Sequence, residues 1–440
     1  MRHRAAALAI VFVLLAVGAC GNRSDDAEPP TTSTAGGEDT TSTTAPEAPM
    51  VGTLVSPCGP GEPADPSNIK IATIADIGGL VPGLGQEMWD AMDAFVAYCN
   101  SLGGINGRPL ELQKLDSELF KHREATQAAC DSALALVGSG APFDDGGAQV
   151  GVDCGIPDIP GYATHPAHAL ATNVVQPLPN VTYRFSTGPG QYIAEQHPEA
   201  VKNAAVVWPA VATTELQAKR LMEAYSGIGY TFTYTGTTNA IETDYAPAAK
   251  AIKDSGAEYL NFVSEGSQLA LLATALRDQG YFPEVLDAGP AAYNQEFLAA
   301  GGDAIEGTYV SVTTWPFEEA DESPALQVYI EWLEKARPDA TPDALGVQAF
   351  SAGLLFATAA KAAGDDLTRE SLMAELKKIH SWDGGGLHGE SDPAAGEPSG
   401  CFAYFRVTGG KFVREFPDEG FECDTSKTVD LKGDYGAGAA

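Results

Sequence analysis

The sequence of 440 residues is poor in basic side chains. It has 26 Lys and Arg against 59 Asp and Glu, which gives a formal net charge of −33 at pH 7. A protein that binds nucleic acid needs a basic surface, so we expect no nucleic-acid partner. The same charge disfavours adhesion to an anionic bilayer, so any attachment to a membrane must be covalent or hydrophobic.

Motifs of common enzyme classes are also missing. The sequence has no G-x-S-x-G nucleophile elbow, no P-loop and no G-x-G-x-x-G at a strand–helix junction. The paired acids Asp144-Asp145 and Glu318-Glu319 are interpreted as exposed loop charge rather than as an acid/base couple. We therefore expect a protein that is not an enzyme and needs no cofactor; an exported hydrolase is the least favoured alternative.

Metal-binding patterns are absent as well, since no C-x-x-C or Cys/His spacing supports a zinc site. His165 and His168 have the H-x-x-H spacing that can ligate a metal on a helix. No third ligand is evident, and Pro166 disturbs the first turn. We expect surface or loop histidines and no metal.

Cysteine is scarce, with seven in the chain. Apart from Cys20 they are even in number, which suggests disulfides in an exported protein, although six cysteines allow many pairings. Chain proximity favours Cys130–Cys154 and Cys401–Cys423, which leaves Cys58–Cys99.

The first residues have the pattern of an export signal. Arg2 and Arg4 precede the apolar residues 5–17, a run too short to span a bilayer as a mature helix. The run ends in Val-Gly-Ala-Cys20, which is similar to a bacterial lipobox whose cysteine receives the lipid. The alternative is an ordinary signal peptide followed by a chance cysteine. We predict a signal peptide over residues 1–19 and lipidation of Cys20 at the outer face of the cell membrane.

Residues 20–66 are rich in Thr, Ser, Pro, Gly, Ala and acids, and nearly lack large apolar side chains. Such a segment cannot offset the entropy cost of ordering, so we predict a flexible tether. A coil of ~45 residues reaches roughly 35–40 Å, enough to hold a folded domain clear of the membrane. Residues 429–440 are predicted to be a disordered tail.

Strand and helix patterns alternate through the rest of the chain. Residues 69–75 form a short apolar strand, residues 88–99 carry apolar side chains at helical spacing, and Gly103-Gly104 ends that helix before a strand at residues 110–117. The other expected strands are residues 156–162, 181–185, 204–208, 230–235, 259–263, 285–288 and 309–314; the other expected helices are residues 123–136, 144–153, 214–225, 246–255, 268–279, 325–336, 346–363 and 372–379. Residues 402–407 and 411–416 are expected to form a hairpin. Residues 186–192 break the pattern.

This alternation predicts an α/β protein with two doubly wound parallel-sheet lobes. A chain of 440 residues is long enough for two cores. Lobe 1 would comprise residues 67–186 and 316–394, and lobe 2 residues 187–315 and 395–428. Three crossings between them would form a hinge.

Four segments resemble the branched-chain amino-acid-type solute-binding proteins of ABC importers. They are the glycine turn of residues 103–112, residues 267–283, the small apolar residues 348–356 and the glycine-rich turn of residues 382–389. The resemblance covers roughly residues 68–423. It implies a type I periplasmic binding protein fold, a clamshell that closes on a small solute and hands it to a membrane permease.

Ligands of parallel α/β sheets bind beyond the carboxyl ends of the strands. In the family that the sequence resembles, two loops of the first lobe hold an α-carboxylate through hydroxyls and backbone amides. The matching loops here contain Pro142, Phe143 and Tyr162, and only Thr164 keeps a hydroxyl nearby. This departure argues against an α-amino acid as the ligand.

Other side chains at these strand ends complete the expected site. The predicted ligand-binding residues are Leu84, Ala141, Pro142, Phe143, Tyr162, Ala163, Thr164, Trp208, Thr213, Glu265, Asp287 and Tyr293. The family places an apolar contact at Leu84. Glu265 or Asp287 can meet an ammonium group, the alternative being a solvated loop carboxylate. The aromatic members can stack on a flat or apolar solute, the alternative being core filling.

We predict a monomeric, lipid-anchored, extracytoplasmic solute-binding protein that delivers a small organic solute, apolar or aromatic in part, to an ABC importer permease. One alternative is a receptor of the same fold that signals to a membrane sensor. Another is a binder of branched-chain amino acids, amides or urea.

Overall fold

The computed structural model describes residues 49–79 and 83–436. The predicted signal peptide, Cys20 and the tether up to residue 48 lie outside the described residues. Everything described below belongs to one compact unit, residues 48–440.

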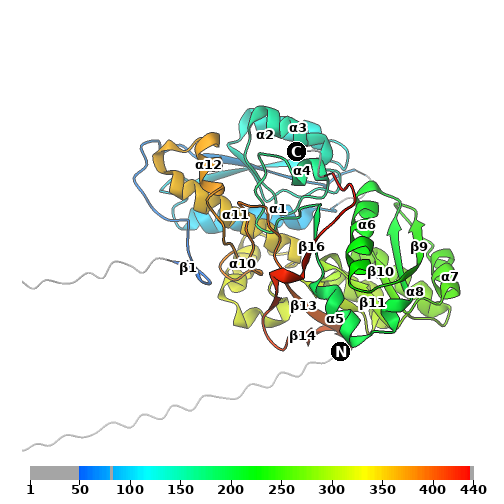
Figure 1. Ribbon diagram of the computed structural model, residues 1–440. Coiled ribbons are helices and arrows are strands. Elements are labelled where there is room, and N and C mark those ends of the chain that lie inside the picture. The colour runs from blue at the N-terminus through cyan, green and yellow to red at the C-terminus, as the bar shows by residue number, and fades with distance from the viewer. Residues whose placement is uncertain (1–48, 80–82, 437–440) are drawn as a thin grey trace, which may run out of the picture. The chain divides into compact units, whose positions relative to one another are not determined.

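The first sheet has four parallel strands in the order β4-β3-β5-β6. They are β3 (Ile69–Ala75), β4 (Leu110–Asp116), β5 (Ala135–Val137) and β6 (Asp158–Ile159). Three helices connect them: α1 (Gln86–Ser101), α2 (His122–Ser132) and α3 (Asp145–Cys154), of which α2 and α3 lie side by side (Figure 1). The prediction that the second helix runs to residue 136 is wrong, because β5 pairs with β3 and β6, and this tertiary pairing overrides the helix propensity of its Ala and Leu.

The second sheet is mixed. Five parallel strands, β12-β11-β10-β8-β9, are extended at one edge by the antiparallel hairpin β13–β14, which the sequence predicted. The strands are β8 (Ala204–Pro209), β9 (Phe232–Thr238), β10 (Tyr259–Phe262), β11 (Val285–Ala288), β12 (Tyr309–Val312), β13 (Cys401–Thr408) and β14 (Lys411–Phe416); β15 (Glu422–Cys423) pairs with β13. The helices that follow these strands are α6 (Ala212–Gly227), α7 (Ala246–Ser255), α8 (Gly266–Asp278) and α9 (Gln295–Gly301). The predicted α/β alternation is confirmed.

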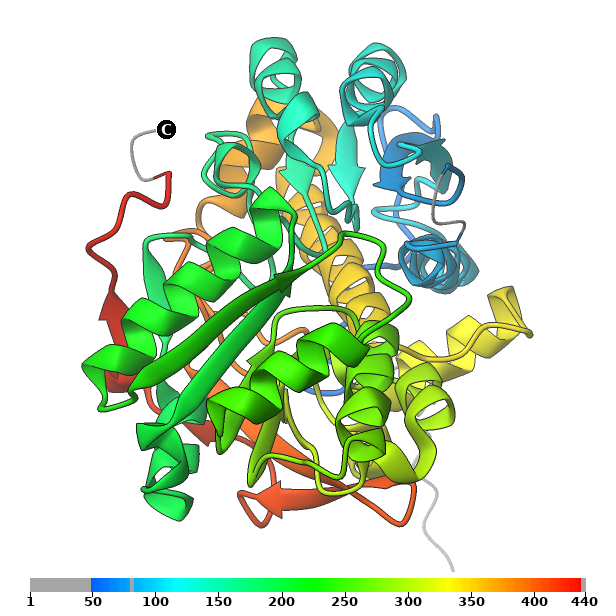
Figure 2. The same ribbon diagram turned by 90° about the vertical axis from the view of Figure 1, so that its right-hand side faces the viewer.

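Helix α11 (Ala344–Ala363) runs through the core, in yellow-orange near the centre of Figure 2. It contacts α1, α10 (Pro324–Ala336), α12 (Arg369–Leu376), β5 and β6. Gly353 is required here because a Cβ atom would lie 2.4 Å from the ring of Phe95. Among the described helices, only the stretch Ala344–Asp366 is long and apolar enough to cross a membrane, but 83% of its apolar window is buried inside the protein. Its hydropathy is that of a core helix.

Between the sheets the chain passes through β7 (Arg184–Ser186), and it returns at its end to pair β16 (Thr428–Asp430) with β7. The predicted break at residues 186–192 is instead the start of α5 (Gly188–Gln196), because Pro189 fits a first helical turn, where its missing N–H is not needed.

Two predictions of disorder are wrong within the described residues. The backbone N–H groups of Lys432 and Gly433 and the hydroxyl of Tyr435 donate to Glu223, so the predicted disordered tail is ordered as far as residue 436. At the other end, β1 (Met50–Val51) pairs with β2 (Leu54–Val55), and Val51 is fully buried, so the tether does not extend to residue 66.

The six cysteines of the described residues pair as chain proximity favoured. The disulfides are Cys58–Cys99, Cys130–Cys154 and Cys401–Cys423. The first of them joins the segment that precedes β3 to the end of α1.

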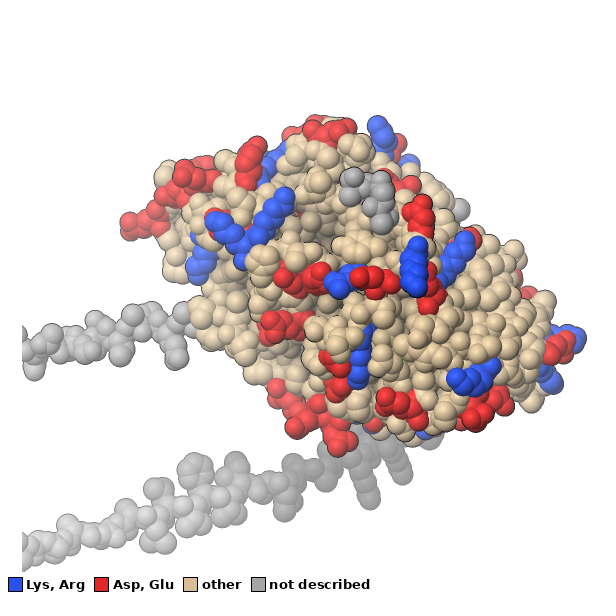
Figure 3. All heavy atoms as spheres, viewed as in Figure 1, with Lys and Arg blue, Asp and Glu red and all other residues tan. Residues whose placement is uncertain are grey.

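The surface agrees with the charge balance of the sequence. On the face shown in Figure 3, acidic side chains are spread widely and the Lys and Arg side chains lie among them. This face therefore carries no continuous basic area of the kind that nucleic acid requires.

Candidate functional site

Asp144 holds together the two first-sheet loops that were predicted to bind ligand. Its carboxylate accepts hydrogen bonds from the backbone N–H groups of Thr164 (2.7 Å) and His165 (2.9 Å) and from the hydroxyl of Thr164 (3.0 Å). The carbonyl oxygens of Ala141 and Pro142 lie 3.3 and 3.1 Å from the same hydroxyl. The hydroxyl of Thr164 is thus engaged between the loops. The interpretation of Asp144 as exposed loop charge is wrong, since it is 1% exposed, whereas Asp145 is exposed.

Beneath these loops, the ring of His168 lies between Asp144 and Asp158, with each ring nitrogen 2.8 Å from a carboxylate oxygen. Burial works to lower the pKa of His168, but the charge of Asp158 and the hydrogen bonds to both carboxylates raise it to about 10. Burial likewise works to raise the pKa of Asp144, and the hydrogen bond and charge of His168 hold it below its usual value.

The expectation of surface or loop histidines is therefore wrong for His168. Pro166 opens the short helix α4 (Pro166–Ala169), His165 caps it, and His168 points into the buried acids. No group of three or more metal-binding side chains is found in the described residues.

Tyr162, which follows β6, is influenced by the charges of acids that belong to both sheets. The pKa of Tyr162 is raised by burial and then by Glu87, at the start of α1, and Glu265, which precedes α8 of the second sheet. Burial, with the charges of Asp343, Glu265 and Asp90, raises the pKa of Glu87 to about 8. The charge of Glu265 therefore reaches Tyr162, although the two residues were predicted from separate loops and Glu265 is exposed. Burial and the charge of Asp343 also raise the pKa of Glu265.

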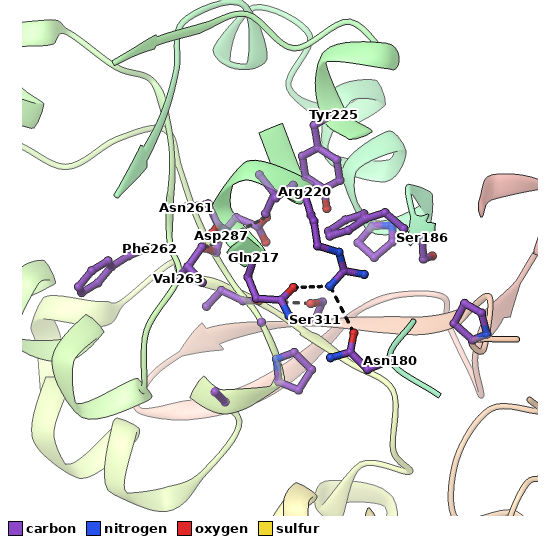
Figure 4. Close-up of a pocket in the computed structure, with 18 of the residues that line it drawn as sticks. Asn180, Ser186, Gln217, Arg220, Tyr225, Asn261, Phe262, Val263, Asp287 and Ser311 are labelled. Atoms are coloured by element: carbon purple, nitrogen blue, oxygen red, sulfur yellow. Dashed lines mark hydrogen bonds between the residues drawn. The ribbon is translucent and has the colours of Figure 1, made fainter. Parts of the chain in front are cut away.

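A cavity of about 400 Å³ lies at the carboxyl ends of β10 and β11. It is bounded by these strand ends, by α6 and by the segment that leads into β7, and its walls are mostly apolar (Figure 4). The residues that line it are Pro179, Asn180, Val181, Arg184, Phe185, Ser186, Pro189, Gln217, Arg220, Leu221, Tyr225, Asn261, Phe262, Val263, Ser264, Asp287, Ala288, Gly289, Pro290, Ala291, Ser311 and Pro398. Asn180 connects it to the first-sheet loops, because its side-chain amide donates to the carbonyl oxygen of Ala163 (2.9 Å).

Arg220 is the buried cation of this cavity, 3% exposed on α6. Its Nη2 donates to the carbonyl oxygens of Val181 (2.6 Å) and Arg184 (2.8 Å), and its Nη1 donates to the side-chain oxygens of Gln217 (2.7 Å) and Asn180 (3.4 Å), as the dashed lines of Figure 4 show for the last two. Nε has no partner in the described structure. Burial lowers the pKa of Arg220 to about 10.

Asp287 also lines the cavity and is 3% exposed. Its carboxylate accepts hydrogen bonds from the hydroxyls of Tyr259 (2.6 Å) and Tyr404 (3.0 Å). Burial raises the pKa of Asp287 to about 6, although these hydroxyls and Asn261 act to lower it. Both oxygens of the Asp287 carboxylate thus accept hydrogen bonds from buried tyrosine hydroxyls.

The remaining predicted residues are dispersed. Phe143 packs against Phe120, with ring centroids 5.2 Å apart. Trp208 lies in β8 and packs against an apolar cluster that includes Tyr225, and neither Trp208 nor Thr213 of α6 lines the cavity. Leu84 is partly buried, directly before α1.

Tyr293 is a core residue rather than a residue of the cleft. It is 1% exposed, donates its hydroxyl hydrogen to Glu318 and accepts a hydrogen bond from the backbone of Phe317. The core-filling alternative is therefore the correct one for this side chain.

Three residues of the cavity were not predicted from the sequence: Arg220, Gln217 and Asn180. One pattern could have found Arg220, since on α6 it belongs to the buried stripe that continues with Leu221, Ala224 and Tyr225. A charged residue within an otherwise apolar helical stripe points to a buried polar contact.

Comparison with known proteins matches this architecture to one family. The model of the family described as periplasmic binding protein matches residues 68–411. Leu/Ile/Val-binding protein homolog 3 of Brucella melitensis biotype 1 is 24% identical over 277 residues, which are 61% of this chain and 72% of that protein.

Two solved structures share the fold. The fatty acid ABC transporter substrate-binding protein from Thermomonospora curvata has a TM-score of 0.69 at 18% identity, covering 82% of this chain and 94% of that one. The solute-binding protein of an ABC transporter from R. palustris, solved in complex with benzoate, has a TM-score of 0.65 at 20% identity, covering 81% and 98%. This chain therefore has the type I periplasmic binding protein fold and belongs to the periplasmic binding protein family.

Proposed function

We propose that this protein is a lipid-anchored receptor that captures one small organic solute, apolar or aromatic in part, and delivers it to the permease of an ABC importer. The observation that carries the proposal is the cavity of about 400 Å³ at the carboxyl ends of β10 and β11. Its volume lies within the range of small-molecule sites, roughly 300–1,000 Å³, and such sites combine apolar walls with a few polar groups.

A two-lobed clamshell is the architecture proposed for capture. Lobe 1, residues 67–186 and 316–394, would contain the first sheet, and lobe 2, residues 187–315 and 395–428, the second. This division is supported by the separate apolar clusters that cover the two sheets. Closure would rotate the sheets about the segments that cross near β7 and expel water from the cavity between them.

The apolar character of the solute is supported by two features. The cavity walls are dominated by aliphatic, aromatic and proline side chains. In addition, the only aliphatic hydroxyl in the two first-sheet loops predicted to hold an amino-acid carboxylate, that of Thr164, is engaged by Asp144. The fatty acid and benzoate named for two structural neighbours are solutes of this kind.

The anchor is proposed from Val17-Gly18-Ala19-Cys20, which lies outside the described residues. The native chain expressed in a bacterial host is expected in the membrane fraction, and Cys20→Ser is expected to release it into the soluble extracytoplasmic fraction. Equal partitioning of the two proteins would contradict lipidation.

A thermal-shift screen tests the function. The mature protein is mixed with amino acids, amides, aromatic acids and fatty acids. A solute at a hundred times its Kd should add about 2.7 kcal/mol of stability. The same solute should reduce the radius of gyration in small-angle X-ray scattering. Selective binding of leucine or valine would contradict the proposed solute class, and a panel without any stabilising member would contradict the function.

A further inference from the structure

We infer, on the basis of the proposed function, that the solute carries a carboxylate and that Arg220 is the residue that binds it. The observation is a guanidinium group that is buried in the cavity wall and has no acidic partner. The proposal adds a charge and a contact residue to a site that was otherwise defined by its apolar walls.

What sets Arg220 apart among the described arginines is its burial. Arg123, Arg277, Arg369 and Arg406 also have no carboxylate within 4.0 Å, but none of these four is buried. Arg108, Arg184, Arg337 and Arg414 each lie within 4.0 Å of at least one carboxylate, although all four are more exposed than Arg220. In the part of the chain that the structure describes, the hydrogen bonds of Arg220 go only to carbonyl and amide oxygens, and its guanidinium carbon lies 5.6 Å from the centre of the Phe185 ring. These dipoles satisfy hydrogen bonds but supply no negative charge.

A ligand carboxylate would supply the missing charge. Burying a charge is costly unless it is paired, and guanidinium–carboxylate contacts are among the strongest hydrogen bonds in proteins. The donors of Arg220 that are least engaged are Nε, which has no partner, and Nη1, whose contact with Asn180 is long at 3.4 Å. A carboxylate oxygen can take the place of the Asn180 amide oxygen without disturbing the two backbone contacts of Nη2.

The body of such a solute would fit the rest of the cavity. Phe185, Leu221, Phe262 and Val263 line it and offer apolar surface to an aliphatic or aromatic group. Asp287 lines the same cavity but forms no ion pair with Arg220 in the described structure, and its two oxygens accept hydrogen bonds from Tyr259 and Tyr404. A monocarboxylate and a zwitterionic amino acid share the proposed carboxylate, and the experiment separates them.

Arg220 also has a structural contact, since Nη2 fixes the carbonyl oxygens of Val181 and Arg184. Removing Arg220 would therefore change the segment between the sheets as well as the binding site. A better variant is Gln217→Glu, because the side-chain oxygen of Gln217 already lies 2.7 Å from Nη1. The variant leaves every contact of Nη2 in place and supplies a carboxylate from within the protein.

The test measures binding by calorimetry with three isosteric probes: 4-methylpentanoate, 4-methylpentanamide and leucine. Benzoate with benzamide and octanoate with octanamide extend the comparison to other apolar bodies. For the native protein we expect at least one carboxylate to bind roughly tenfold or more tightly than its amide. Stronger binding of 4-methylpentanoate than of leucine would identify a monocarboxylate. The reverse order would identify an amino acid, which would keep the role of Arg220 but contradict the proposed solute class.

Gln217→Glu is expected to reduce the ratio of carboxylate affinity to amide affinity by roughly tenfold or more. The matched control is Ser226→Glu, which adds the same charge at an exposed position of the same helix outside the cavity and should alter affinity by less than about twofold. Because the comparison of carboxylate with amide uses the native protein, it holds even if Gln217→Glu does not fold.

Two results would overturn the inference differently. If an amide binds as tightly as its carboxylate, or if Gln217→Glu leaves the ratio of carboxylate affinity to amide affinity unchanged, Arg220 does not bind the solute and the solute-binding proposal stands. If no probe of any charge binds, the inference and the proposed function fail together.

Discussion

Replacing Asp144 by asparagine is expected to lower the free energy of unfolding by about 3–5 kcal/mol, the range for breaking a buried charged pair from one side. The carboxylate of Asp144 is 1% exposed and accepts hydrogen bonds from Thr164, His165 and His168. Asparagine keeps one oxygen, but its amide group would face an N–H donor. It also removes one of the two charges that keep the buried ring of His168 protonated.

The loss of stability in Asp144→Asn should change with pH in a direction that follows from the two pKa shifts. The pKa of His168 is raised from 6.5 to about 10 in the folded protein, so its stabilisation is complete below pH ~6.5 and is lost as the pH rises through about 10. The pKa of Asp144 is lowered from 3.8, so its stabilisation is present above pH ~4 and is lost as the pH falls through its lower folded value. The stability difference between the native protein and Asp144→Asn should therefore be largest between about pH 4 and 6.5 and should shrink toward pH 10.

Urea unfolding followed by circular dichroism, at several pH values, measures this difference. The control is Asp145→Asn, at the next position, where the side chain is exposed and opens α3. Its loss should stay under about 1 kcal/mol, the usual effect of a charge near a helix terminus. A loss below 1 kcal/mol for Asp144→Asn, or a difference that grows from pH 6.5 to 10, would refute the assignment of a charged His168 between two carboxylates.

Three further outcomes are expected. Replacing both Cys58 and Cys99 by serine should lower the free energy of unfolding by about 4 kcal/mol, because their disulfide closes a loop of 41 residues. Urea unfolding without reductant measures this loss. Adding reductant should bring the free energy of unfolding of the native protein closer to that of the variant. Phe350→Ala should cost about 3–5 kcal/mol in the same assay, because its ring fills the core between α11 and α1, whereas the exposed Phe120→Ala should cost under about 1 kcal/mol. The free energy of unfolding of Asp287→Asn should rise relative to that of the native protein between about pH 4 and pH 6. The reason is that the pKa of Asp287 is raised to about 6 in the folded protein, so the native protein loses stability as the pH rises through this range. A stability difference that does not change over this range would contradict the raised pKa.

Much of the fold could be predicted because its strands are buried on both faces. The strands β3 and β11 and the helix α7 have the limits that the sequence indicated, since short apolar runs between turn residues are typical of parallel sheets covered by helices. The strands that were missed or misplaced are two or three residues long. β5 and β16 exist because a neighbouring strand offers hydrogen bonds, and that partner is not adjacent in the sequence.

The candidate site was harder to predict than the fold because a loop position does not determine the direction of a side chain. Tyr162 and Tyr293 both follow strands of parallel sheets, and both were expected in the cleft. The pKa of Tyr162 is influenced by acids of both sheets, whereas Tyr293 turns into the core and bonds to Glu318. The difference comes from the segments packed against each loop, which lie far away in the sequence.

The surroundings of two neighbouring acids were equally hard to predict from the sequence. Asp144 and Asp145 are chemically identical and adjacent, yet only Asp144 meets His168, which is 24 positions further along the chain. Arg220 differs from the four arginines with acidic partners because its helix packs against carbonyl oxygens of residues 181 and 184. The role of a charged residue thus depends on which groups fold against it. The helical stripe of α6 indicates in advance that Arg220 is buried, and only the structure reveals that its hydrogen-bond partners among the described residues are carbonyl and amide oxygens.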